Sequence, residues 1–214
     1  DLQLHLNDNY IFLENYSTSE GAMSAYEGFR MESDVKAGGL NQADLTSDDM
    51  YYTKAEMKSM IQNYRKLGLD IIPEFDTPAH SLSFTKVRPD LRFRATGRQN
   101  DHFNLNTKYD ESLAFVESIW DEYIKGDDPV FDRDTIVNIG TDEYDGQYTE
   151  QFRKFTDDLL AYIQDNGNTV RLWGSPIWKS YSKKRKHIRK KRRGSDEYLE
   201  RWMGKSESYV SAGI

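Results

Sequence analysis

The chain has 214 residues and a formal net charge of −7 at pH 7, from 29 Lys and Arg against 36 Asp and Glu. It contains no cysteine, which excludes disulfides, thiol nucleophiles and thiolate metal sites. No apolar run approaches the ~20 residues of a membrane-spanning helix. In so polar a chain, the 14 Tyr, 10 Phe and 4 Trp must supply much of the core and of any binding cleft.

The first half of the chain predicts a strand, a long loop, a helix and a second strand. Residues 2–6 alternate leucine with polar side chains, which is the period of a β-strand ending at Asn7-Asp8. About 45 residues without clear periodicity follow, and a loop of this length is more often functional than incidental. A helix then begins at Thr53, where Glu56 completes a capping box. The buried stretch LDIIPEFD is a strand that we expect to end near Pro73-Glu74.

The second half continues the alternation. Helical periodicity covers residues 108–124, with Gly126 as a stop, and returns over residues 149–164. The stretches TIVNIGTDEY and TVRLWGS are the third and fourth strands. Alternating strands and helices predict an α/β fold with a parallel sheet, either a (β/α)8 TIM barrel or a doubly wound sheet. No glycine-rich phosphate-binding turn follows any of these strands, which favours the barrel.

Polar and aromatic side chains follow every predicted strand. In a parallel barrel, the active site lies at the carboxyl ends of the strands. The residues that we place there are Asn7, Asp8, Glu74, Asp76, His80, Asp142, Glu143, Tyr144 and Trp173. The strand ends carry no metal-ligand repeat and no nucleophile elbow, so the sequence predicts neither a metal nor a cofactor.

Asp142 and Glu143 are adjacent carboxylates at one strand end. Crowding two like charges raises the pKa of at least one of them, as a general acid requires. The alternative is a solvated acidic turn. The preceding IVNIG is too apolar for a surface turn, and Gly140 allows close backbone approach, so context favours the catalytic interpretation.

His80 and Trp173 each have two interpretations. A loop histidine by itself is more often structural than catalytic, but Asp8 and Glu143 at neighbouring strand ends would allow an Asp–His–Glu relay in which His80 tunes the acid. Trp173 is either a core aromatic or the wall of a sugar pocket.

Together these segments resemble glycoside hydrolase family 20, the β-N-acetylhexosaminidases and lacto-N-biosidases. The segments, in the family's order, are LQLHLND, YYTKAEMKSMIQNYRKLGLDIIPEFDTPAHS, IVNIGTDEY and VRLWGS. The resemblance implies that residues 1–175 form a partial (β/α)8 barrel. The family's first strand would precede Asp1 and its last strands would follow Ile214, so we expect an incomplete pocket.

The resemblance also implies a retaining exo-glycosidase acting on terminal β-linked N-acetylhexosamine by substrate-assisted catalysis, in which the substrate's acetamido oxygen forms an oxazolinium ion. Glu143 would be the general acid and base, and Asp142 would hold the acetamido nitrogen. Asp8 and His80 would support the acid. Substrate binding is assigned to Asp76, Tyr144 and Trp173.

The sequence leaves alternatives open for both the subfamily and the class of function. The stretches AYEGFRMESDV and GDDPVFDRDTIVNIGTDEY look more like lacto-N-biosidases, which release the disaccharide lacto-N-biose, than like lysosomal hexosaminidases. That likeness implies a secreted or surface protein of a bacterium with a glycan as its partner. A non-catalytic carbohydrate-binding fragment is the alternative of another class.

Residues 176–214 form an anomalous basic tail, with ten Lys and Arg between Lys179 and Arg193. One explanation is an arm that binds nucleic acid. The other is a displaced reading frame. The codons of residues 202–204 force Gly-Trp in the displaced frame, and permitted codons around them allow a stretch resembling the family's sixth strand and next helix. We favour the displaced frame, in which the basic run has no selected function and nucleic-acid binding is not expected.

Overall fold

The computed structural model describes residues 1–9, 26–35, 44–93 and 101–173. The chain divides into two compact units, Asp1–Leu172 and Trp173–Ile214. Of the second unit, only Trp173 lies among the described residues. The predicted boundary at residue 175 and both explanations of the basic tail therefore stay predictions, and the fold described below is that of the first unit.

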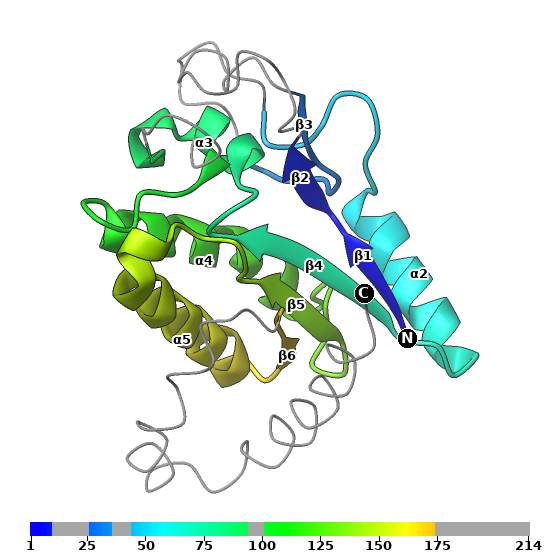
Figure 1. Ribbon diagram of the computed structural model, residues 1–214. Helices are drawn as coiled ribbons and strands as arrows, with labels where there is room; N and C mark the ends of the chain where they lie inside the picture. The colour runs from blue at the N-terminus through cyan, green and yellow to red at the C-terminus, as the bar shows by residue number, and fades with distance from the viewer. Residues whose placement is uncertain (10–25, 36–43, 94–100, 174–214) are drawn as a thin grey trace, which may run out of the picture. The chain divides into compact units, whose positions relative to one another are not determined.

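A four-stranded parallel sheet forms the centre of this unit (Figure 1). Its strands are β1 (Leu2–His5), β4 (Ile71–Thr77), β5 (Ile136–Gly140) and β6 (Thr169–Arg171), and they lie side by side in that order. Every neighbouring pair is parallel. The α/β class and the parallel sheet are confirmed. Among these four strands the spatial order follows the chain order, without the reversal that marks a doubly wound sheet.

Three helices make the crossovers between these strands: α2 (Lys54–Lys66), α4 (Tyr109–Ile124) and α5 (Thr149–Asp165). The predicted capping box opens α2, because Thr53 Oγ1 accepts from Glu56 N at 3.1 Å and the Glu56 carboxylate accepts from Thr53 N at 2.8 Å. Among the described residues, no helix combines the length and the apolar character needed to cross a membrane.

Aromatic packing fixes the middle strand. Phe75 of β4 contacts Trp120 and Tyr123 of α4, with ring centroids 4.5 Å and 5.1 Å apart, and Phe29 at 4.9 Å. All seven residues of β4 are buried, as expected for a parallel strand covered on both faces. The strand that carries Glu74 and Asp76 is therefore buried along its whole length.

Two strand boundaries differ from the sequence prediction. The first strand is interrupted at Leu6, and Asn7–Asn9 forms a separate strand, β2, antiparallel to β3 (Glu27–Phe29) within the long predicted loop. Strand β4 continues past Pro73 to Thr77, so Glu74 and Asp76 lie within the strand rather than after it. The proline is tolerated because the register between β4 and β5 starts at Glu74, which leaves its missing N–H outside that ladder. A short helix, α3 (Leu82–Val87), follows β4.

Candidate active site

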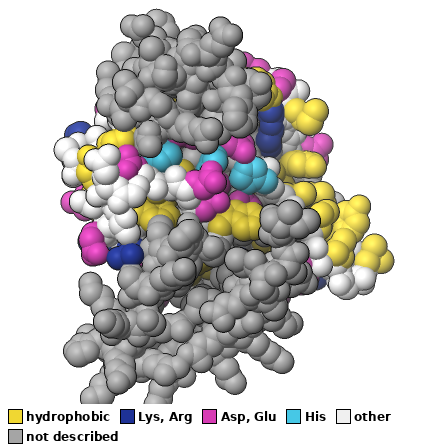
Figure 2. Space-filling model, viewed as in Figure 1, with side chains coloured by type: hydrophobic (Ala, Val, Ile, Leu, Met, Phe, Trp, Pro, Cys, Tyr) yellow, Lys and Arg dark blue, Asp and Glu magenta, His cyan; other side chains and the backbone are white. Residues whose placement is uncertain are grey.

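The predicted site residues of the first unit gather where β2, β4 and β5 end. His80 comes three residues after β4, and Asp142 and Glu143 come directly after β5 and Thr141. Asp8 reaches the same place from β2. In the space-filling view, acidic and histidine side chains lie close together on one face (Figure 2).

His80 connects the acids. Its Nδ1 lies 3.1 Å from Asp8 Oδ1, and its Nε2 lies 3.3 Å from Glu143 Oε2. Nε2 is also 3.8 Å from Asp142 Oδ1. The structure thus brings together the residues of the predicted relay, and it leaves the Glu143 side chain 73% exposed, at the mouth of the site.

Both ring nitrogens of His80 face carboxylate oxygens, which only accept hydrogen bonds when ionised. Burial acts to lower the pKa of His80, but the hydrogen bond to Asp8 and the negative charges of Asp76 and Asp8 outweigh it and raise the pKa to about 10. His80 is therefore an imidazolium at neutral pH, and it faces Glu143 as a positive charge.

At this site, Asp142 and Asp76 are two acids with a raised pKa. Burial is the main cause for Asp142; the charge of His80 opposes it, and the charge of Glu143 adds to it. Burial and the charge of Asp142 raise the pKa of Asp76 well above its usual range. Asp76 is only 2% exposed. The expected crowding of carboxylates is therefore present, and it extends to a third acid in β4.

Oδ1 of Asp76 and Oδ1 of Asp142 are both buried without a hydrogen-bond partner among the described residues. Two ionised carboxylates cannot satisfy each other, because neither donates. A proton retained on Asp76 provides a donor toward Asp142, in keeping with the raised pKa of Asp76. Oδ1 of Asp142 is thus a buried acceptor for which the described residues provide no hydrogen-bond donor at hydrogen-bonding distance.

In the part of the chain that the structure describes, two groups of side chains have the spacing of metal ligands, with ligand atoms within 4.8 Å of one another. They are His5, Glu74 and Asp76, and Asp76, His80 and Asp142. In both groups the histidine nitrogens already contact carboxylates. A cation would have to displace protons from these contacts, so the donor sets suit proton-bearing histidines better than a resident metal.

The backbone of the site is strained at three non-glycine residues. His80, Thr141 and Glu143 have φ values of 50°, 66° and 46°. Such left-handed conformations are uncommon outside glycine, and clusters of them mark functional sites. Thr141 N donates to Thr77 O at 3.1 Å and ties the end of β5 to that of β4. Two of the three strained residues, His80 and Glu143, are predicted site residues whose side chains contact each other.

Asn7 is a site residue whose role the sequence analysis missed. Its buried amide donates to Asp76 O at 2.8 Å and His80 O at 3.0 Å, and its Oδ1 accepts from Asp76 N at 2.7 Å. It thus clamps β4 and the His80 loop to β2. Its position beside Asp8 at a strand end was the available signal.

Tyr144 occupies a packed position. Its hydroxyl donates to Phe103 O at 2.7 Å and accepts from Leu105 N at 3.2 Å. Its ring stacks on His102 and Phe152, with centroids 4.8 Å and 5.5 Å away. These contacts favour a structural role over the predicted substrate contact.

Trp173, the first residue of the second unit, is 44% exposed. Its predicted role as a pocket wall stays a prediction.

Residues 1–212 match the family model described as "Glycosyl hydrolase family 20, catalytic domain". The chain belongs to glycosyl hydrolase family 20. The family resemblance that the sequence predicted is therefore confirmed. The match includes the basic run, although the last segment that resembles the family, VRLWGS, ends at residue 175.

Two curated family 20 relatives are similar to parts of the chain. Lacto-N-biosidase of Bifidobacterium bifidum is 24% identical over 149 residues, which are 59% of this chain and 13% of that protein. Human β-hexosaminidase subunit beta is 31% identical over 113 residues, 50% of this chain and 19% of that protein. The chain therefore matches less than a fifth of the length of each.

Solved family 20 structures share the fold. The N-acetyl-β-hexosaminidase of Streptomyces plicatus aligns with a TM-score of 0.51 and 20% identity, covering 81% of this chain and 32% of that one. Identity at this level supports the fold alone. Family 20 catalytic domains are TIM-barrel-like, in agreement with the sequential parallel strands β1, β4, β5 and β6.

Proposed function

We propose that this family 20 chain carries the acid–base centre of a retaining exo-glycosidase that removes terminal β-linked N-acetylhexosamine by substrate-assisted catalysis. The observation that carries the proposal is the contact of one histidine, His80, with both Asp8 and Glu143. We also propose that the four parallel strands are part of a (β/α)8 barrel, since they are laid down in chain order.

Glu143 is the proposed general acid. Its exposed side chain can approach the oxygen of a leaving group from the open side of the site. After the leaving group departs, the same carboxylate accepts a proton from the attacking water. The His80 imidazolium stabilises the carboxylate that forms when Glu143 gives up its proton, and Asp8 holds that imidazolium in place.

Asp142 is the proposed partner of the substrate's acetamido group. Its buried Oδ1 has no hydrogen-bond partner among the described residues, and an acetamido N–H would satisfy it. That contact turns the acetamido oxygen toward the anomeric carbon, where it displaces the leaving group and forms the oxazolinium ring. Substrate binding would also favour the charged form of Asp142, which stabilises the positive ring.

The test is the hydrolysis of a chromogenic N-acetyl-β-glucosaminide by a complete family 20 catalytic domain that contains this chain, and by its variants. Glu143→Gln should lower kcat by at least about 100-fold, in keeping with the loss of a general acid. Glu150→Gln, which removes an exposed acid in α5, is the matched control and should keep full rate. Full activity of Glu143→Gln would refute the assignment.

The product class is the second question. The two curated relatives support either a single amino sugar or lacto-N-biose as the product. Chromatography of the products from a lacto-N-tetraose substrate distinguishes them. Binding of a thiazoline analogue of the oxazolinium ion without any hydrolysis would instead favour the non-catalytic carbohydrate-binding alternative.

We retain two proposals on the wider protein. The first is a secreted or surface location in a bacterium, which is supported by the lacto-N-biosidase likeness alone. Fractionation of the source cells tests it. The displaced frame of residues 176–214 has its support in the codons of residues 202–204 alone. Nucleotide sequencing across residues 174–179 tests it, and an intact frame would refute it.

A further inference from the structure

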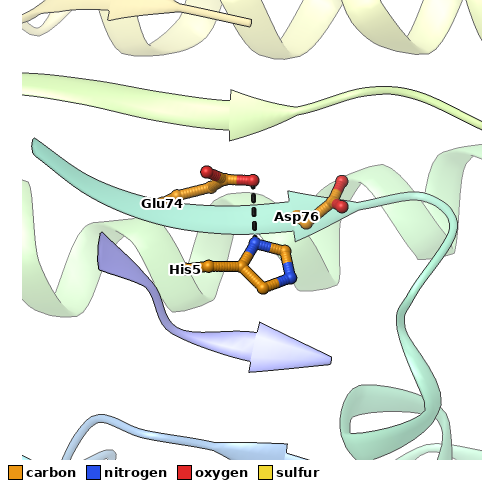
Figure 3. A group of neighbouring side chains, drawn as sticks. All are labelled: His5, Glu74 and Asp76. Atoms are coloured by element: carbon orange, nitrogen blue, oxygen red, sulfur yellow. Dashed lines mark hydrogen bonds and ion pairs between the residues drawn. The ribbon is translucent and has the colours of Figure 1, made fainter. Parts of the chain in front are cut away.

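His5, the last residue of β1, lies between two carboxylates. Its Nδ1 is 3.0 Å from Glu74 Oε1, and its Nε2 is 3.1 Å from Asp8 Oδ2. Figure 3 shows the first of these contacts, with the ring beside β4 and Asp76 farther along the same strand. His5 and Glu74 are direct partners in the β1–β4 register. The contact with Glu74 is therefore built into the sheet.

The two contacts require a charged ring. A neutral imidazole has one N–H and can donate to one acceptor, whereas ionised carboxylates only accept. Two short contacts to two ionised carboxylates are both hydrogen bonds only when His5 carries protons on both nitrogens. Glu74 is fully buried, and its other oxygen accepts from the Gln3 amide. Its negative charge is thus held in place against His5.

Asp8 is shared by two histidines. Its Oδ2 faces His5 and its Oδ1 faces His80, while Asn9 N also donates to Oδ1 at 2.7 Å. Rotation of the Asp8 carboxylate would break one of the histidine contacts. The orientation that serves His80 is therefore also fixed from the His5 side.

We propose that His5 is a positioning residue of the catalytic centre, and that its imidazolium bridges Glu74 and Asp8 and so holds Asp8 in the orientation that keeps His80 against Glu143. The part of this proposal that concerns catalysis rests on the proposed function. It extends the relay from three residues to five, with charges that alternate from the buried β4 strand to the exposed acid. The relay consists of Glu74, His5, Asp8, His80 and Glu143.

Electrostatics agree with this arrangement. The hydrogen bonds to Asp8 and then to Glu74 raise the pKa of His5 to about 10, against an opposing effect of burial. Burial acts to raise the pKa of Asp8, but the hydrogen bonds from His5 and His80 hold it well below its usual range.

The titratable and charged groups around His5 come from several elements, and the acids predominate. They are Asp8 of β2, Glu74 and Asp76 of β4, His80 after β4, and Tyr26 and Arg30 beside β3. Of these, Asp8, Tyr26 and Arg30 line one cavity of about 270 Å³ together with His5. The carboxylates of Glu74 and Asp8 are the groups in direct contact with the His5 ring, and a cationic His5 pairs with both.

Nitrogen NMR of the histidine rings in the 214-residue chain tests the bridge without any variant. At pH 8 an ordinary histidine is neutral. We expect the His5 and His80 rings both to show the imidazolium signature at that pH. A neutral His5 ring at pH 8 would overturn the proposal.

The variant His5→Gln separates positioning from mere packing. Carbon NMR of the Asp8 carboxyl should show its titration moving to higher pH by about 1 to 3 units, because one of its two cations is gone. A purely structural His5 would leave that titration in place, so an unmoved Asp8 in a folded variant contradicts the proposal. Lys154→Gln, which removes an exposed cation from Asp158, is the matched control and should leave Asp8 unaffected.

Kinetics add a readout on catalysis. His5→Gln should lower kcat by about 10-fold with KM nearly unchanged. An unchanged kcat in the folded variant would contradict the link from His5 to the acid. The NMR titration does not depend on turnover, so failure of the proposed function, shown by an active Glu143→Gln, is distinguishable from failure of the His5 bridge.

Discussion

Asn7 holds the backbone of Asp76 with a pair of hydrogen bonds, accepting from Asp76 N at 2.7 Å and donating to Asp76 O at 2.8 Å. This exchange replaces the ladder that β1 would have made had it continued past His5, because the chain turns away at Leu6 to form β2. The amide side chain thus lets the chain leave the sheet without orphaning buried backbone groups.

Asn7→Ala should therefore destabilise the fold by about 2 to 4 kcal/mol, since it leaves a buried N–H and a buried C=O unpaired. Urea unfolding followed by circular dichroism measures the effect. The control is Asn63→Ala, which removes an exposed amide of α2 that donates to Ser59 Oγ and should change stability little. Equal effects of the two substitutions would contradict the clamp.

Gly140, the last residue of β5, lies against Asp76. Its φ is 67°, and a Cβ at this position would overlap both the backbone and the carboxylate of Asp76. Gly140→Ala should cost about 2 to 5 kcal/mol, from the left-handed backbone and the overlap together. Gly126→Ala is the control, because φ there is 97° but a Cβ would meet nothing within 4 Å.

Thermal unfolding of the two variants separates the contributions. The control should lose only about 1 to 2 kcal/mol, which is the backbone cost alone. If Gly140→Ala lost no more than the control, the close approach to Asp76 would be without consequence.

The raised pKa of His80 makes stability depend on pH on the alkaline side. The folded pKa, about 10, lies above the ordinary value, so the contribution of His80 is complete below about pH 6.5 and is lost as the pH rises through 10. The free energy of unfolding should fall across this window. In His80→Gln the fall should be smaller, and an unchanged slope would show that His80 does not hold its proton through Asp8.

At acidic pH, the dependence of stability on pH is expected to come from Asp8. Its folded pKa is depressed, so its contribution is complete above the ordinary carboxyl range, near pH 4, and is lost as the pH falls further. Asp8→Asn removes this dependence. We expect the variant to be less stable than the parent at pH 6 and closer to it at pH 3, as measured by urea unfolding at the two values.

Local sequence patterns predicted most of the fold. The capping box of Thr53 and Glu56, the helix stop at Gly126 and the strand–helix alternation are short-range features, and each depends on residues a few positions apart. Strand ends in a parallel sheet meet at one edge, so that alternation also predicted that Asp8 and Glu143 would come together.

Contacts between residues far apart in the chain could not be predicted from the sequence. The pairing of β2 with β3 joins two stretches with no periodicity of their own, and the partner of a polar strand residue such as His5 depends on register with a strand nearly 70 positions away. The left-handed backbone at Glu143 has no sequence signal either, since residues other than glycine rarely adopt it.

Tyr144 allows a direct test of packing against substrate binding. Tyr144→Phe removes the hydroxyl that joins the backbone of Phe103 and Leu105, so it should lower the free energy of unfolding by about 1 to 3 kcal/mol. If the role is packing, KM for the chromogenic substrate stays within about twofold, whereas a lost hydrogen bond to substrate would raise KM about 10-fold. Tyr64→Phe, at an exposed position in α2, serves as the control and should change neither quantity. A raised KM with unchanged stability would restore the substrate-binding role that the sequence predicted.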